Sequence, residues 1–274
     1  MSTLEEQPLD ETFDSLYQVL HRERTRTETE CEAFEEFADR ITDLRPMGAS
    51  SSISPTEETL QTTGPSETLV SRASSTPSMI DHLAAIRDAY EETVISVPFY
   101  EAKYGDTYEE SLYEEFGHDI ATALTQGSGF SPTAKRVLLA KVEQAHAEQE
   151  TLIETYEHEH ESIEEAAAML IPIDEELQSF ESIPLNEQGF GALEAHRARL
   201  LTLKNKCEQA ATTRQVTIQD HRREYSLPIE VPDICAYLYK PLETDYPISA
   251  LCSELAHQIE TYRRNVEHAM GAHS

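Results

Sequence analysis

The sequence contains no tryptophan and only six lysines, and it is strongly acidic. Its 52 aspartates and glutamates outnumber 21 lysines and arginines, which gives a formal net charge of -31 at pH 7. Because the acids are spread over the whole chain, they are typical of a solvated surface adapted to high salt. The alternative is an acidic partner-binding face or a mimic of nucleic acid. The shortage of cations makes nucleic acid an unlikely partner, because undirected binding depends on neutralising phosphates.

Cysteines are also few, and long apolar runs are absent. Cys31, Cys207, Cys235 and Cys252 lie far apart without a CxxC pair, which argues against a disulfide framework or a zinc ribbon. We therefore expect reduced thiols and a cytoplasmic location. The longest apolar run, Ala166 to Ile173, is far too short for a membrane span. The acidic N-terminus does not resemble a signal peptide.

Hydrophobic spacing predicts an all-α protein of long amphipathic, coiled-coil helices that form a bundle, together with a cluster of short helices. No segment alternates apolar and polar residues as a half-buried strand would. We divide the chain into an N-terminal amphipathic helix at 1–45, a flexible linker at 46–78, a helical core with two long helices at 79–226, and a Pro-punctuated segment with a final helix at 227–274. The linker is rich in Ser, Thr and Pro, so we expect it to be disordered.

The first helix has an apolar end that needs a partner. Phe34, Phe37 and Ile41 form this end, whereas Glu23 and Thr27 make the middle of the same seam polar. A helix with such a seam is not stable alone. We therefore predict a partner seam at the three apolar residues, filled by a protein partner, by self-association or by the rest of the chain.

A longer helix begins at Pro132 and keeps strict four-three spacing. Its seam consists of Leu138, Val142, Ala145, Gln149, Leu152, Tyr156, Glu159, Ile163, Ala166 and Leu170. Glu159 is a polar position in this seam, of the kind that fixes register and partner choice. We expect Pro172 to break the helix, because an interior proline removes a backbone hydrogen bond. A separate short helix is expected from Asp174 to Glu181.

Aromatic residues are concentrated between Ser96 and Gly117. The cluster consists of Phe99, Tyr100, Tyr104, Tyr108, Tyr113 and Phe116. The chain turns several times here: Gly105 predicts a turn, and Thr107 with Glu110 predicts a capping box. We favour the interpretation that these rings cover the ends of the long helices. The alternative is an exposed aromatic site for a partner.

Motifs for catalysis or cofactors are missing. His158 and His160 alternate with glutamates, but residues two apart on a helix point roughly 200° from each other, so they cannot share a metal. The sequence has no HExxH motif, Walker loop, GxGxxG motif or Gly-flanked serine elbow. We therefore expect a non-enzymatic interaction or scaffold protein without cofactor or metal.

A regulator that binds DNA is the alternative function. Residues 110–141 can be read as a unit resembling a helix-turn-helix, in which Lys135 and Arg136 lie near the start of the last helix. Two cations among so many acids are weak support for this reading.

Four stretches together resemble one protein family. They are RTETECEAFEEFADRI, IRDAYEETVISVPFYEAKYGDTYEESLYEEFGHDIATAL, SPTAKRVLLAKV and DICAYLYKPLETDYPISAL. They resemble an uncharacterised haloarchaeal family, some members of which are labelled halobacterial-transducer-like (HTR-like). The resemblance covers most of the chain apart from the predicted linker. It implies a small helical protein of unknown function from a salt-rich cytoplasm, and it transfers no catalytic residue.

The net charge leads to a prediction about salt. We expect the midpoint of thermal unfolding to rise steadily from dilute buffer to multimolar KCl, because counter-ions relieve repulsion between the acids. Circular dichroism at a helical wavelength measures this midpoint. A protein of similar size with a net charge near zero is the control, and its midpoint should rise much less over the same range of KCl. A midpoint that is independent of KCl would contradict the prediction.

Overall fold

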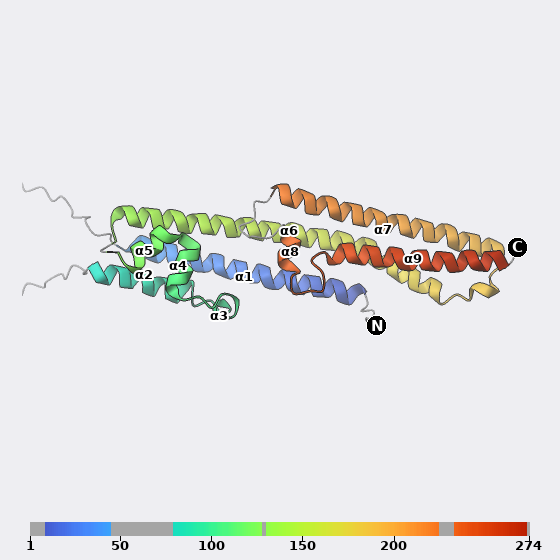
Figure 1. The fold of residues 1–274 in the computed structure, drawn as a ribbon, viewed down its shortest axis with the longest axis horizontal. Coiled ribbons are helices and arrows are strands. Elements are labelled where there is room, and N and C mark those ends of the chain that lie inside the picture. Colours follow the sequence, from blue (N-terminus) through green and yellow to red (C-terminus); the bar gives the residue numbers. More distant parts are fainter. Residues whose placement is uncertain (1–8, 45–78, 128–129, 225–232, 273–274) are drawn as a thin grey trace, which may run out of the picture. The chain divides into compact units, whose positions relative to one another are not determined.

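The computed structural model describes residues 9–44, 79–127, 130–224 and 233–272, and the predicted linker at 46–78 lies outside them (Figure 1). These residues form helices and turns without any strand, which confirms the all-α class. They group into two compact units. The first contains the described residues of Met1–Glu28 and Glu148–Ser274, and the second contains those of Thr29–Ala147. The units differ from the four predicted segments, because helices α1 (Leu9–Asp43) and α6 (Pro132–Glu181) each contribute to both.

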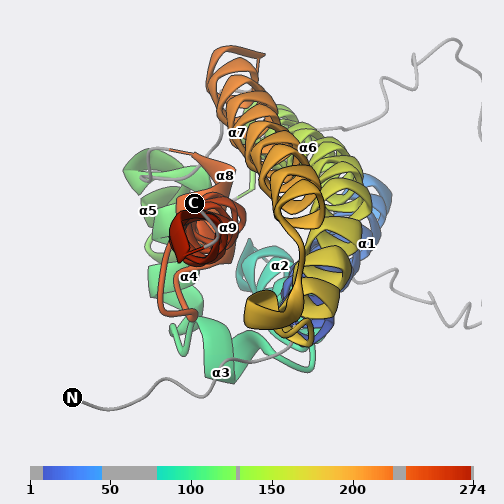
Figure 2. The same cartoon turned by 90° about the vertical axis from the view of Figure 1, so that its right-hand side faces the viewer.

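The first unit combines parts of α1 and α6 with the later helices. These are the 3-10 helix η1 (Leu185–Glu187), α7 (Phe190–Glu224), α8 (Ile234–Leu238) and α9 (Pro247–Ala272). Within this unit α6 and α9 run in one direction, and α1 and α7 run in the other (Figure 1). Helices α7 and α9 pack along each other, and Figure 2 looks nearly along α9 with α7 running obliquely beside it.

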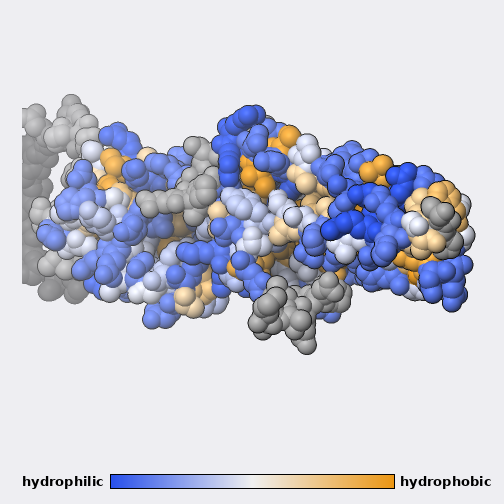
Figure 3. Space-filling view, turned by 45° about the vertical axis from the view of Figure 1, so that its right-hand side comes forward, coloured by the Kyte–Doolittle hydropathy of each residue, from blue (hydrophilic) through white to orange (hydrophobic). Residues whose placement is uncertain are grey.

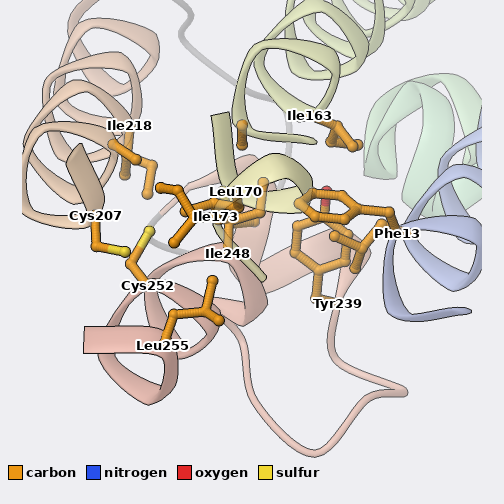
Figure 4. Packing of buried hydrophobic residues seen from close by; sticks show 14 of the residues in the cluster. Phe13, Ile163, Leu170, Ile173, Cys207, Ile218, Tyr239, Ile248, Cys252 and Leu255 are labelled. Atoms are coloured by element: carbon orange, nitrogen blue, oxygen red, sulfur yellow. The ribbon is translucent and has the colours of Figure 1, made fainter. Parts of the chain in front are cut away.

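The core of the first unit is continuous. Figure 4 shows residues from α1, α6, α7, α8 and α9 converging on it, including Phe13, Ile163, Leu170, Ile173, Cys207, Ile218, Tyr239, Ile248, Cys252 and Leu255. The sulfur atoms of Cys207 and Cys252 point toward each other there. None of the four cysteines forms a disulfide, and burial raises the pKa of Cys207 to about 11 and that of Cys252 above its usual value. Cys207 and Cys252 therefore act as small apolar groups at neutral pH.

Pro172 lies inside α6, so the predicted break at this residue is wrong. The side chain is exposed, and a proline on the outer side leaves the Ala168 carbonyl near solvent. Ile173, Leu177 and Phe180 continue the four-three spacing beyond it and are all buried. Burying each of them contributes about 1.5–3 kcal/mol. Together they outweigh the cost of ~3 kcal/mol for a proline within a helix.

The second unit contains four short helices beside its parts of α1 and α6. These are α2 (Met79–Thr93), α3 (Tyr100–Lys103), α4 (Tyr108–Phe116) and α5 (His118–Thr125). The predicted capping box is present at the start of α4: the Thr107 hydroxyl accepts from the Glu110 N–H, and the Glu110 carboxylate accepts from the Thr107 N–H. Gly117 joins α4 to α5 with φ of 80°, a conformation that other residues rarely adopt.

The apolar end of α1 is buried inside this unit, so the rest of the chain fills the predicted seam in this structure. Phe34, Phe37 and Ile41 are each at most 2% exposed. The Phe37 ring lies 5.1 Å from that of Tyr90 in α2 and 6.3 Å from that of Phe116 in α4. Helices that the sequence places after the linker therefore supply the partner, which spacing within α1 alone could not reveal.

A substitution at Pro172 tests why α6 continues. We expect Pro172→Ala to raise the free energy of unfolding by ~1–3 kcal/mol, because alanine restores the N–H that the Ala168 carbonyl lacks. Urea unfolding followed by circular dichroism measures this change. Glu175→Ala, at an exposed position of the same helix, is the control and should stay within ~0.5 kcal/mol of the unmodified chain. Destabilisation by Pro172→Ala would contradict the account.

Candidate functional site

The predicted aromatic cluster divides into buried and exposed rings. Tyr100, Tyr108 and Phe116 are buried, and Phe99 is half-buried. Tyr104 and Tyr113 are 43% and 51% exposed. The structure therefore does not gather all six rings into one site.

The buried rings pack around Tyr90. Its ring centroid lies 5.8 Å from that of Tyr108 and 5.9 Å from that of Phe116. Its hydroxyl forms a 2.8 Å hydrogen bond with that of Ser111. Burial raises the pKa of Tyr108 to about 12, although the Arg87 guanidinium 5.0 Å from its ring acts in the opposite direction. These phenols therefore stay neutral and serve the packing of the second unit.

The exposed rings have different surroundings. The Tyr104 hydroxyl donates to Glu30, and the Lys103 ammonium lies 4.9 Å from the centre of the same ring. That ammonium also pairs with Glu30 at 3.1 Å. The Tyr113 and His118 rings make an edge-to-face contact with their centroids 5.6 Å apart, and Tyr113 is 51% exposed.

One of the two cations in the predicted unit resembling a helix-turn-helix, Lys135, is engaged within the fold. Lys135 donates from its ammonium to the carbonyls of Thr42 and Leu44, at 2.6 and 2.7 Å. A lysine at the last carbonyls of a helix complements their partial negative charge. Lys135 thus caps the end of α1, and Arg136 next to it is exposed.

A buried ion pair lies in the first unit, between α6 and α7. Glu159 is fully buried and Arg214 is 3% exposed. The two guanidinium Nη atoms donate to the two carboxylate oxygens at 2.9 and 2.6 Å. A bidentate, charge-assisted contact of this kind is among the strongest in proteins.

Further polar groups complete this buried network. Arg214 also donates to Ser162 Oγ at 2.6 Å and to Cys235 Sγ at 3.1 Å, and the Tyr239 hydroxyl donates to Glu159 at 2.5 Å. Burial would lower the pKa of Arg214, but the Glu159 carboxylate outweighs burial and raises it. Burial and the same carboxylate raise the pKa of Tyr239 and of Cys235. The network thus holds one positive and one negative charge, while its phenol and thiol stay neutral.

Local sequence places Cys235 and Tyr239 against this pair. Asp233 caps α8 by accepting from the Ala236 N–H at 3.0 Å, and it also accepts from Arg222 Nε at 2.8 Å and from the Tyr246 hydroxyl at 3.0 Å. Burial would raise the pKa of Asp233, but these donors outweigh it, so the pKa is lowered. The cap therefore stabilises the fold above the unfolded pKa of ~3.9, and this contribution is lost as pH falls through the lower folded pKa.

A cavity of about 260 Å³ adjoins the ion pair. Its walls are Ser162, Glu165, Ala166, Ala168 and Met169 from α6, with Ala210, Thr213 and Arg214 from α7. Ala166 and Ala210 occupy seam positions where most neighbours are larger. Small side chains on both helices leave this space unfilled.

Comparison with known proteins identifies a family but no activity. The family described as "Domain of unknown function (DUF7260)" matches residues 11–263. The chain belongs to this family. Searches among curated proteins and among solved structures found no match.

Three residues of the buried polar network were not identified from the sequence: Ser162, Arg214 and Tyr239. The available signal was a seven-residue spacing in α7, where Leu193, Leu200, Cys207, Arg214 and His221 are all buried. An arginine in that series lies in a helix seam and requires a buried acid. Glu159, already recognised as a seam position in α6, is that acid.

Among the described residues of the chain, no group of three His, Cys, Asp or Glu side chains is placed to hold a metal ion. Nor does any helix among them combine the length and the apolar character needed to cross a membrane.

The ion pair predicts that removing one of its charges destabilises the protein more than removing both. We expect Arg214→Met to lower the free energy of unfolding by ~3–5 kcal/mol, because Glu159 is left charged in the core. Combining it with Glu159→Leu should recover more than half of the loss, since both charges are then removed. Urea unfolding measures each variant.

The control is Arg223→Met on the same helix, where the side chain is 74% exposed and pairs with Asp220. It should change the free energy of unfolding by less than ~0.5 kcal/mol. Additive losses from the two core substitutions would contradict the account of a coupled pair.

Proposed function

We propose that this DUF7260 protein is a non-enzymatic interaction or scaffold protein that binds a positively charged segment of another protein. The observation that carries the proposal is the Tyr113 ring on α4, which is 51% exposed. Glu109, also exposed, precedes it by one helical turn and so lies on the same face of α4. An aromatic face beside carboxylates suits an ammonium or guanidinium group, which interacts with both.

The chain uses the same chemistry internally. Lys103 lies over the Tyr104 ring and pairs with Glu30, so a cation, a phenol ring and a carboxylate already meet in the second unit. Tyr113 offers the ring and the acids without a cation of this chain over the ring, among the described residues. A lysine or arginine from a partner would complete a similar arrangement.

The surface supports a local contact rather than a broad hydrophobic interface. On the face that Figure 3 shows, the surface is mostly hydrophilic and hydrophobic residues form small, separate patches. The proposal includes a salt-rich cytoplasm, supported by the net charge of -31. Screening there acts over about 3 Å, so attraction must come from groups in contact. Contact between a cation and a ring meets that requirement.

The DNA-binding alternative receives less support. It depends on Lys135 and Arg136, and the Lys135 ammonium is already bonded to two carbonyls of α1. Binding phosphate with Lys135 would require breaking both bonds and exposing the end of that helix.

Site-specific photo-crosslinking tests the proposal. A photoreactive amino acid replaces Tyr113 in one preparation and Val216, which is also 51% exposed, in the matched control. Both are crosslinked in extract of the source cells in multimolar KCl, and the captured peptides are sequenced by mass spectrometry. We expect position 113 to capture a defined peptide rich in Lys and Arg, and position 216 not to capture it.

Binding of the captured peptide, made synthetically, completes the test. Tyr113→Ser should weaken its binding at least about ten-fold, whereas Tyr113→Phe, which keeps the ring, should retain most of it. Equal capture at both positions, peptides without cations, or loss of capture after nuclease treatment would contradict the proposal.

A further inference from the structure

The proposed interaction function makes no use of the cavity beside Arg214. All its walls belong to α6 and α7 within the first unit. Ala166, Met169 and Ala210 contribute apolar surface to a volume of about 260 Å³. An apolar cavity of about 150 Å³ is large enough for benzene. The space therefore suits one ring with a short substituent.

Arg214 brings an unused hydrogen-bond donor to this wall. Its four Nη hydrogens go to Glu159, Ser162 and Cys235, with two of them to Glu159. The Nε–H is the fifth donor, and it has no acceptor in the described part of the chain. The Arg214 side chain is 3% exposed, and its Nε is not among the fully buried polar atoms that lack a partner. This N–H can therefore be reached from the cavity, whose walls include the exposed residues Glu165, Ala168 and Thr213.

Ser162 brings a second donor to the same cavity. Its oxygen accepts from Arg214 at 2.6 Å, and its own O–H has no acceptor among residues 9–44, 79–127, 130–224 and 233–272. A serine hydroxyl donates one hydrogen bond as well as accepting. Two donors thus border an apolar space, and an occupant with one acceptor oxygen would replace the water that otherwise accepts from them.

The surrounding charges exclude an anion. Glu159 already neutralises Arg214 through two contacts, so the pair presents no net positive charge. Glu165 adds a carboxylate to the cavity wall. A ligand carboxylate would be placed near two acids of a chain whose net charge is -31.

We propose that the cavity between α6 and α7 binds a small neutral molecule that has an apolar ring or chain and one carbonyl oxygen. The carbonyl accepts from Arg214 Nε–H and Ser162 O–H, and the apolar part lies against Ala166, Met169 and Ala210. The ion pair has a double role: it holds α6 to α7, and it turns a cationic side chain into a neutral donor.

Three probes of similar size test this assignment: acetophenone, ethylbenzene and benzoate. They share a ring and differ in the polar group. We expect saturable binding of acetophenone by ligand-observed NMR to the full-length chain in multimolar KCl. Ethylbenzene should bind about three- to ten-fold more weakly, the usual value of one or two hydrogen bonds. Benzoate should bind more weakly than acetophenone.

Cavity variants show where the probe binds. Ala210→Leu should abolish acetophenone binding by filling the space, and the control Ala198→Leu, at an exposed position of α7, should leave it unchanged. Ser162→Ala should weaken acetophenone about three-fold and leave ethylbenzene unaffected. Thermal unfolding confirms that each variant is folded before binding is measured.

Three results would overturn the proposal: no saturable binding of acetophenone, equal binding by folded Ala210→Leu, or tighter binding of benzoate. A dimer that Ala210→Leu converts to monomer, without any probe binding, would assign the cavity to a second copy and also overturn it. Tyr113→Ser should not affect probe binding, so this test and that of the proposed function fail independently.

Discussion

The contact between Glu159 and Arg214 is the interaction on which the first unit depends. Removing two charges from water is unfavourable by several kcal/mol for each ion, and only near-ideal geometry with further hydrogen bonds offsets this. Both conditions hold, because two Nη atoms meet two carboxylate oxygens while Ser162, Cys235 and Tyr239 occupy other sites on the pair. A shift of α7 by one turn would separate the charges inside an apolar core. The pair therefore contributes more to specifying the register of α6, α7 and α8 than to net stability.

The distribution of charge reinforces this arrangement. Helix α7 carries seven of the chain's 21 basic residues and only four acids, in a protein where acids predominate. Its cations meet acids of neighbouring helices: Arg199 pairs with Glu176 of α6, and Lys204 lies 3.7 Å from Glu260 of α9. Each exposed pair contributes little alone, and less in salt. Together they make α7 the one long helix whose charge attracts its neighbours, so an acidic chain can pack three long helices without strong repulsion between them.

Much of the fold could be predicted from the sequence, because its rules are local. Spacing of apolar residues predicted the long helices, and Thr107 with Glu110 predicted the start of α4. Pro172 was misjudged because a local rule was applied against a seam that continues through Phe180. The site was harder to predict, because Glu159 lies 55 residues from Arg214 and 80 residues from Tyr239 along the chain. The spacing in α7 places an arginine in a seam, but only packing shows which acid it meets.

Departures from good packing are the most informative places in a protein of unknown function. Most seam positions of α6 and α7 hold residues that fill their space, so a core chosen only for stability would have larger side chains than Ala166 and Ala210 beside Arg214. It would also give the Nε–H of that arginine an acceptor. Similarly, a chain that buries Tyr100 and Tyr108 leaves Tyr113 half in solvent beside acids. Natural sequences break such rules mainly where function requires it. The cavity and the exposed ring lie in different units, so selection can maintain a ligand site and a partner site separately.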